Sequence, residues 1–164
     1  MTEPTVQSLA KTIIERFGAH KMMVATAESC TGGMIAAALT EIAGSSAVVD
    51  RGFVTYSNEA KSEMLGVPMA QIVEHGAVSD QIVSAMVSGA LAHSKAEIAV
   101  AVTGIAGPSG GSDEKPVGLV YIAAQRRNKE VVVSRELFGD IGRDEVREKT
   151  VIKALQMLLD QLTP

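Results

Sequence analysis

The stretch AESCTGG at residues 27–33 follows a short apolar run at residues 22–25 and leads into an Ala-rich helical pattern at residues 34–42. This order predicts that Ser29 lies where a strand turns into a helix. The first N–H groups of a helix have no partner inside it, and the helix dipole adds positive potential there, so an anion or a developing oxyanion is stabilised. The stretch therefore indicates either a serine nucleophile or an N-cap hydroxyl followed by flexible glycines.

The composition limits the class of protein. The 164 residues fit one domain, 1–164, that is large enough to bury an aliphatic core without disulfides. Cys30 is the single cysteine and no Cys/His cluster exists, so we expect a reducing compartment and no metal site. A net charge of −4, mixed signs along the chain and 3% aromatic residues argue against nucleic acid as a partner.

The chain also shows no sign of membrane targeting. Residues 1–7 lack the basic and apolar regions of a signal peptide, and no stretch approaches the roughly 20 apolar residues that a membrane span requires. We therefore expect a cytoplasmic protein without membrane contact.

Helical and extended patterns alternate along the chain. Helices are predicted at residues 8–17, ended by Gly18, at 33–42, at 59–65, capped by Asn58, at 79–91 and at 143–162. Strands are predicted at residues 22–25, 48–56, 97–102, 117–124 and 131–138, the last two antiparallel and joined by residues 126–129. Residues 97–102 are almost continuously aliphatic, which is typical of a strand covered on both faces. Together these elements predict an α/β fold, a three-layer α/β/α single domain with a mixed, mostly parallel sheet.

A second glycine-rich segment, TGIAGPSGG at residues 103–111, directly follows that buried strand. It therefore leaves the sheet at a carboxyl end, where open α/β sheets hold their ligands. Neither glycine-rich segment contains the Gly-x-x-x-x-Gly-Lys-Ser/Thr or the Gly-x-Gly-x-x-Gly pattern, so a nucleoside triphosphatase or a dinucleotide dehydrogenase is not indicated. The two loops suggest one crevice, although a tight connection also requires glycines.

A serine nucleophile needs a base, because its hydroxyl is hardly ionised near neutral pH. None of the three histidines lies beside a motif, but Lys61 closes the segment YSNEAK at residues 56–61, in company with Tyr56 and Asn58. A desolvated lysine has a lowered pKa and can accept the serine proton. The alternative is a solvated lysine on an exposed helix.

Several motifs in order resemble the C-terminal domain family of the competence/damage-inducible protein CinA. They are AESCTGG at residues 27–33, YSN at 56–58 with Lys61 and LGV at 65–67, GAVS at 76–79, and VTGIAGP at 102–108 with Gly118. The resemblance covers nearly the whole chain. It implies hydrolysis of the carboxamide of nicotinamide mononucleotide to nicotinate mononucleotide and ammonia, with this small nucleotide as the partner and with no metal or organic cofactor.

The resemblance also implies roles for individual residues. Ser29 is expected to be the nucleophile and Lys61 the general base, with Tyr56 near the site and Glu28 orienting Lys61 or pairing with another charge. Oxyanion or substrate contacts are expected from Cys30, Thr31, Gly32, Gly33, Asn58, Thr103, Gly104, Ala106, Gly107, Arg143 and Arg147.

Within this set, Arg143 and Arg147 lie four residues apart on one helix face and are candidates for the phosphate, or else ordinary surface arginines. The segment FGDIGR at residues 138–143 departs from the family spacing. Cys30 is expected to contribute its backbone N–H and a small packed thiol.

Three functions therefore stay open: the amidohydrolase, a nucleotide-binding or regulatory module without turnover, and another amidase or esterase that uses the same Ser/Lys pair. An exposed apolar helix face would indicate a homodimer.

Overall fold

Five strands form one sheet in the order β2-β1-β3-β4-β5 in the computed structural model, which describes residues 3–162. β1 pairs in parallel with both β2 and β3, whereas the β3–β4 and β4–β5 pairs are antiparallel. Four of the five strands therefore point the same way, although only two of the four pairings are parallel. The strands are β1 (Val24–Glu28), β2 (Val49–Val54), β3 (Ile98–Gly104), β4 (Leu119–Arg126) and β5 (Val132–Leu137).

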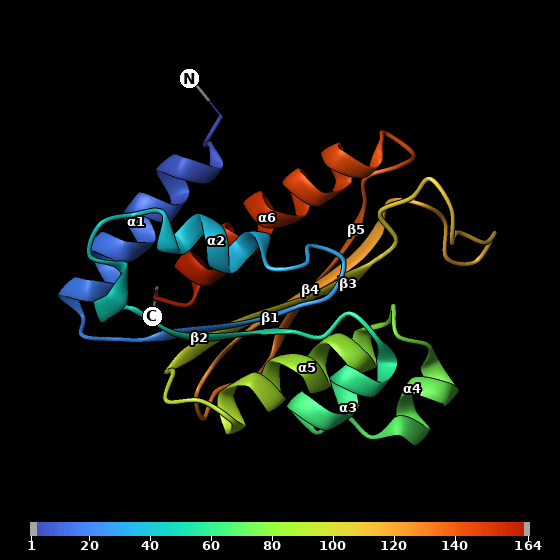
Figure 1. The fold of residues 1–164 in the computed structure, drawn as a ribbon, viewed down its shortest axis with the longest axis horizontal. Helices are drawn as coiled ribbons and strands as arrows, with labels where there is room; N and C mark the ends of the chain where they lie inside the picture. The colour runs from blue at the N-terminus through green and yellow to red at the C-terminus, as the bar shows by residue number, and fades with distance from the viewer. Residues whose placement is uncertain (1–2, 163–164) are drawn as a thin grey trace.

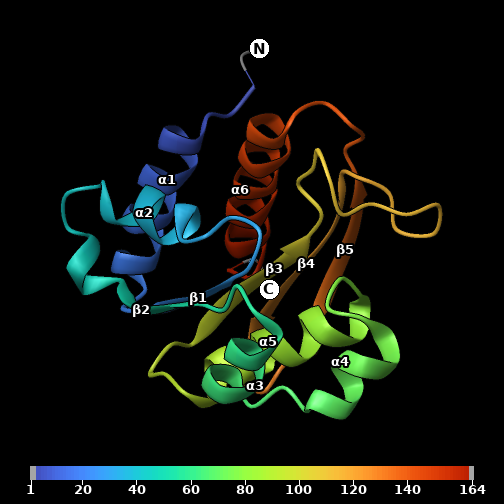
Figure 2. The same ribbon diagram turned by 45° about the vertical axis from the view of Figure 1, so that its right-hand side comes forward.

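Helices cover both faces of this sheet (Figures 1 and 2). One face carries α1 (Val6–Ala19), α2 (Met34–Thr40) and α6 (Arg143–Asp160), and the other carries α3 (Asn58–Leu65), α4 (Met69–His75) and α5 (Asp80–Ala92). A 3-10 turn, η1 (Ser45–Ala47), precedes β2. Each face has its own apolar core, and every residue of β1 is buried between the two. The predicted three-layer α/β arrangement is confirmed.

Close packing against α5 fixes the position of α3. A Cβ atom added at Gly89 of α5 would lie 2.1 Å from the carbonyl oxygen of Leu65, at the end of α3. Only a residue without a side chain permits this approach. At its other end α3 is capped by Ser57, whose Oγ accepts the N–H of Ala60 at 3.0 Å. Because α3 is held at both ends, the side chains on its inner face have fixed positions.

Several predicted boundaries need correction. β1 begins at Val24 and runs to Glu28, so Ser29 follows the strand directly. Gly18 lies inside α1, which ends one residue later, and Ser57 rather than Asn58 caps α3. The sequence predicts no helix where α4 lies, because only Ile72 of this short helix is buried and no apolar periodicity results. The chain ends at residues 1–2 and 163–164, part of the predicted domain and N-terminal segment, lie outside the described residues.

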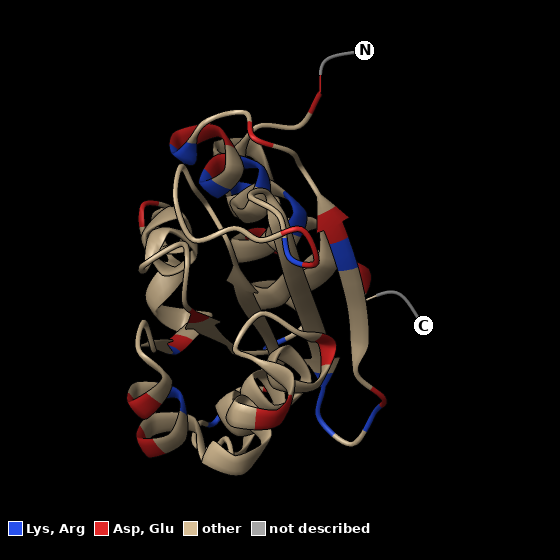
Figure 3. Ribbon diagram, turned by 90° about the vertical axis from the view of Figure 1, so that its right-hand side faces the viewer, with Lys and Arg blue, Asp and Glu red and all other residues tan. Residues whose placement is uncertain are grey.

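Charged residues of both signs are interspersed along α6 and β5 (Figure 3). No helix in the described part of the chain is long and apolar enough to cross a membrane. That the protein binds no nucleic acid stays a prediction.

Candidate active site

A cavity of about 340 Å³ opens at the carboxyl ends of the parallel strands β1 and β3. This volume lies within the range of small-molecule sites, and the carboxyl ends of strands are where open α/β sheets bind ligands. The lining residues come from both glycine-rich segments, from α3 and from α6, so the two predicted loops do share one crevice. They are Ser29, Cys30, Tyr56, Asn58, Lys61, Ala77, Val78, Thr103, Gly104, Ile105, Ala106, Gly107, Ser109, Gly110 and Arg143.

Ser29 and Lys61 meet inside this cavity. Ser29 follows the last residue of β1, and Lys61 points inward from the first turns of α3. The distance from Lys61 Nζ to Ser29 Oγ is 3.0 Å. Lys61 is only 1% exposed and Ser29 8%, so both groups are shielded from bulk water.

The surroundings of the Lys61 amine are neutral. Nζ donates to the carbonyl oxygen of Thr55 at 3.0 Å and to that of Tyr56 at 3.3 Å. Among residues 3–162, no carboxylate forms an ion pair with it. Burial lowers the pKa of Lys61 below its ordinary value, because desolvation disfavours the ammonium form. The predicted alternative of a solvated lysine is wrong.

Glu28 does not contact Lys61. Its buried carboxylate instead accepts three hydrogen bonds at the start of α2: from the hydroxyl of Thr31 at 2.5 Å and from the N–H groups of Ile35 at 2.9 Å and Ala36 at 3.1 Å. A carboxylate is favourable at a helix N-terminus, where it compensates the partial positive charge. Glu28 therefore fixes the loop that carries Ser29.

This arrangement changes which N–H groups can stabilise an oxyanion. Glu28 occupies the first free donors of α2, and the N–H of Gly32 donates to the carbonyl of Ser29 at 3.1 Å. In the described chain, the N–H groups of Cys30, Thr31 and Gly33 have no acceptor on another residue. The expected contribution of the Gly32 N–H is therefore wrong, and neither Gly32 nor Gly33 lines the cavity.

Cys30 follows the serine directly and lines the cavity, and its thiol is buried. Burial raises its pKa to about 11. A thiol with such a pKa is protonated near neutral pH, and the protonated form is a weak nucleophile. This agrees with the predicted role of Cys30 as a small packed side chain.

The mouth of the cavity is bridged by Arg143, at the first position of α6. Its Nη2 donates to the hydroxyl of Tyr56 at 3.1 Å, and its Nη1 donates to the carbonyl of Gly107 at 2.9 Å. Tyr56 is 62% exposed, so its ring stands at the rim, whereas its carbonyl oxygen lies at the amine of Lys61.

The second glycine-rich segment forms the opposite wall. Thr103 is buried at the end of β3, and its hydroxyl donates to the carbonyl of Ala77 at 2.9 Å, which ties this wall to the segment before α5. The predicted residues Gly104, Ala106 and Gly107 do line the cavity, as does Asn58. Sequence reasoning missed the lining residues Ala77, Val78, Ile105, Ser109 and Gly110, although GAVS at residues 76–79 was a visible motif.

Two further predicted ligand contacts, Thr31 and Arg147, do not line the cavity. Thr31 is fully buried and its hydroxyl is used by Glu28. The guanidinium of Arg147 donates to the carbonyls of Cys30 at 3.1 Å and Thr31 at 3.3 Å, so it binds the back of the loop. Arg147 lies about one helical turn after Arg143 in α6, and this distance along the helix places it away from the mouth of the cavity.

No three His, Cys, Asp or Glu side chains converge as a possible metal site within residues 3–162. That the reaction needs no cofactor stays a prediction.

The CinA C-terminal domain family matches residues 6–162. The nicotinamide-nucleotide amidohydrolase PncC of Escherichia coli K12 is 48% identical over 162 residues, which are 98% of this chain and 97% of that protein. A putative competence-damage inducible protein of Caldicellulosiruptor bescii is 47% identical over 93% of this chain, but this match covers only 36% of that longer protein.

Solved structures agree with these matches. The crystal structure of the competence/damage inducible protein CihA from Agrobacterium tumefaciens has a TM-score of 0.94 and 57% identity, covering 98% of this chain and 97% of that one. The competence damage-inducible protein A from Klebsiella pneumoniae has a TM-score of 0.92 and 39% identity, covering 97% of this chain and 98% of that one.

Proposed function

The chain belongs to the CinA C-terminal domain family, and from this membership we propose that it hydrolyses nicotinamide mononucleotide to nicotinate mononucleotide and ammonia. A relative that aligns over nearly its whole length is named a nicotinamide-nucleotide amidohydrolase. The observation that carries the proposal is the 3.0 Å contact between the buried amine of Lys61 and the hydroxyl of Ser29.

The hydrogen bonds around Lys61 suit a general base. A neutral amine has two N–H groups and one lone pair. The carbonyls of Thr55 and Tyr56 accept the two N–H groups, which leaves the lone pair for the hydroxyl of Ser29. After proton transfer, the ammonium has three donors for the same three oxygens. Neither protonation state requires the site to rearrange.

In the first half of the reaction, Ser29 Oγ attacks the carboxamide carbon and its proton passes to Lys61. The carbonyl oxygen of the substrate becomes an oxyanion, and the donor that we assign to it is the N–H group of Cys30, the residue of the loop after Ser29 that lines the cavity. Loss of one such donor typically costs about 3 kcal/mol. Lys61 then returns the proton to the amide nitrogen, the C–N bond breaks, and ammonia leaves with an acyl ester on Ser29.

In the second half, water attacks the ester carbon and Lys61 accepts a proton from it. The bond to Ser29 Oγ breaks as Lys61 gives the proton back to that oxygen. The carboxylate of nicotinate mononucleotide and the original enzyme are the products, so water supplies every atom that is added.

Arg143 is the cation that we assign to the phosphate. It lies at the mouth of the cavity, and it uses two of its five N–H groups for Tyr56 and Gly107. A guanidinium matches a phosphate with two parallel hydrogen bonds, so the remaining donors are suited to this ligand.

The decisive test is ammonia release by the purified protein from nicotinamide mononucleotide, nicotinamide riboside and nicotinamide. Release from the nucleotide alone supports the proposal and the role of the phosphate. Equal release from simple amides would favour a general amidase. The longer relatives show that this domain also occurs within larger chains. Binding of the nucleotide without ammonia release would therefore favour the nucleotide-binding or regulatory module.

A further inference from the structure

Arg147 holds the back of the segment that carries the nucleophile, residues 29–33, here called the nucleophile loop. It extends from the second turn of α6, and its guanidinium donates to two successive backbone carbonyls of the loop, those of Cys30 and Thr31. An atom added as Cβ at Gly32 would lie 3.5 Å from its Nη2. More than 110 residues separate Arg147 from these two carbonyls in the sequence, so only the tertiary fold brings them together.

The contact fixes the direction of a peptide plane. The only cis peptide bond among residues 3–162 is Gly107–Pro108, so the Cys30–Thr31 peptide is trans. In a trans peptide the C=O and the following N–H point in opposite directions. Because the carbonyl of Cys30 faces the guanidinium, the N–H of Thr31 points away from it. Thr31 is fully buried and does not line the cavity, so the contact fixes the conformation of the loop rather than a donor for the ligand.

We propose that Arg147 is a positioning residue: by holding the carbonyls of Cys30 and Thr31 it fixes the nucleophile loop, so that Ser29 Oγ stays at the amine of Lys61. This inference rests on the proposed acyl transfer at Ser29. The alignment of nucleophile and base matters when Ser29 Oγ attacks the substrate carbon, so its loss affects the transition state more than substrate binding.

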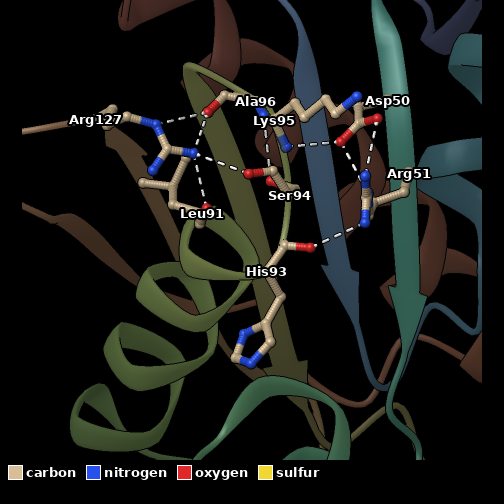
Figure 4. Close-up of polar contacts among 8 residues, drawn as sticks. All are labelled: Asp50, Arg51, Leu91, His93, Ser94, Lys95, Ala96 and Arg127. Atoms are coloured by element: carbon tan, nitrogen blue, oxygen red, sulfur yellow. Dashed lines mark hydrogen bonds and ion pairs between the residues drawn. The ribbon is translucent and has the colours of Figure 1, made fainter.

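The molecule contains a matched arginine at the other end of the sheet. The guanidinium of Arg127 donates to the carbonyls of Leu91 at 2.7 Å and Ala96 at 2.6 Å, and also to that of Ser94 (Figure 4). It binds backbone carbonyls as Arg147 does, but no lining residue of the cavity is among them. Arg127→Ala therefore controls for the loss of an arginine that binds backbone carbonyls.

The first experiment compares Arg147→Ala with Arg127→Ala in kcat, KM and thermal unfolding. We expect both variants to lose stability, but only Arg147→Ala to lose kcat, by up to about 100-fold, with KM nearly unchanged. Guanidinium ion at concentrations below the denaturing range should restore part of the kcat of Arg147→Ala, and equal sodium chloride should not. Unchanged kcat in Arg147→Ala, an equal loss in Arg127→Ala, or no rescue would each overturn the inference.

A second measurement does not depend on the substrate. A fluorophosphonate forms a bond from phosphorus to Ser29 Oγ and expels fluoride, and its phosphoryl oxygen takes the oxyanion position. We expect mass spectrometry to show slower labelling of Ser29 in Arg147→Ala than in the wild type or in Arg127→Ala. If the wild type is labelled but releases no ammonia, the proposed substrate is wrong and the labelling rates still test Arg147. If the wild type is not labelled at Ser29, the nucleophile assignment fails, and this inference fails with it.

Discussion

At both ends of the central sheet, charged side chains bind backbone N–H and carbonyl groups, but they serve different purposes. At the carboxyl end of β1, Glu28 accepts N–H groups at the start of α2, and Arg147 donates to carbonyls of the nucleophile loop. At the amino end of β3, the carboxylate of Glu97 accepts the N–H of Met23 at 2.6 Å, and Arg127 binds the carbonyls at the end of α5 (Figure 4). In both places a carboxylate and a guanidinium satisfy backbone groups that the strands and helices leave without partners.

The two ends differ in the charged groups that lie beside these interactions. At the amino end, Arg51 is paired with Asp50 at 2.8 Å and is 45% exposed in its side chain. At the carboxyl end these interactions hold the loop whose Ser29 contacts Lys61, a fully buried amine without a counter-ion in the described chain. Burial without charge compensation reduces stability and lowers a lysine pKa, so such a group is a typical mark of a reactive site. A substitution at the carboxyl end can therefore be compared with a matched substitution at the amino end.

Replacing Lys61 should have the largest effect. We expect Lys61→Met to lower kcat with nicotinamide mononucleotide by about 10²- to 10⁴-fold, because the base is removed. Lys61→Arg should be equally inactive, since a guanidinium stays protonated. Lys95→Met, at the amino end, is the control and should keep wild-type turnover. Activity in Lys61→Arg would show that the residue supplies only positive charge.

Replacing Glu28 should have the next largest effect. In Glu28→Gln the amide offers one acceptor oxygen where the carboxylate served three donors, so we expect a loss of about 1–3 kcal/mol in the free energy of unfolding. Ammonia release should fall as well, because the nucleophile loop loses its anchor. Glu97→Gln removes the corresponding carboxylate at the amino end and should reduce stability only. Chemical denaturation and turnover assays on both variants measure these two effects. An equal loss of turnover in Glu28→Gln and Glu97→Gln would contradict the role of Glu28 as the anchor of the nucleophile loop.

The buried amine predicts a pH dependence of stability. The pKa of Lys61 is lower in the folded chain than in the unfolded one, so between these two values the unfolded chain binds the extra proton. The free energy of unfolding therefore rises with pH through this window, up to the pKa of lysine in the unfolded chain, about 10.4. Thermal midpoints of the wild type and Lys61→Met between neutral pH and that limit should shift in favour of the wild type as pH rises. A constant difference would mean that Lys61 titrates as it does in water.

Asp50 should show the smallest effect, in the acidic range. Its pKa is lowered, first by the N–H of Lys95 and then by Arg51. The stabilisation is present above the unfolded pKa of about 3.9 and is lost as pH falls through the folded value. Asp50→Asn should therefore cause a small loss of thermal stability at neutral pH that vanishes in acid, with turnover unchanged. Reduced turnover would mean that the two ends of the sheet are coupled.

Much of the site could be predicted from the sequence because it depends on which segments directly follow which strands along the chain. A nucleophile directly after a buried strand, and a glycine-rich segment after its parallel neighbour, must meet at the same edge of the sheet. The contact from Lys61 to Ser29 rests on the family resemblance, because the spacing of an isolated lysine does not show whether it is buried.

The misassigned residues have roles that depend on tertiary packing. Arg147 shares a helix face with Arg143, yet its shift along α6 takes it behind the nucleophile loop. Glu28 precedes the nucleophile, and two of its three donors come from a helix that begins only at Met34. Short elements such as α4 also leave little periodic signal, since Val73 on that helix is 80% exposed.

The most direct test of the central claim compares ammonia release from nicotinamide mononucleotide by Ser29→Ala and Cys30→Ala. The two residues are adjacent and both line the cavity, but only the hydroxyl of Ser29 contacts Lys61. Abolished release in Ser29→Ala, together with most of the wild-type rate in Cys30→Ala, is the predicted result. Wild-type release by Ser29→Ala, or its loss in Cys30→Ala alone, would contradict the account.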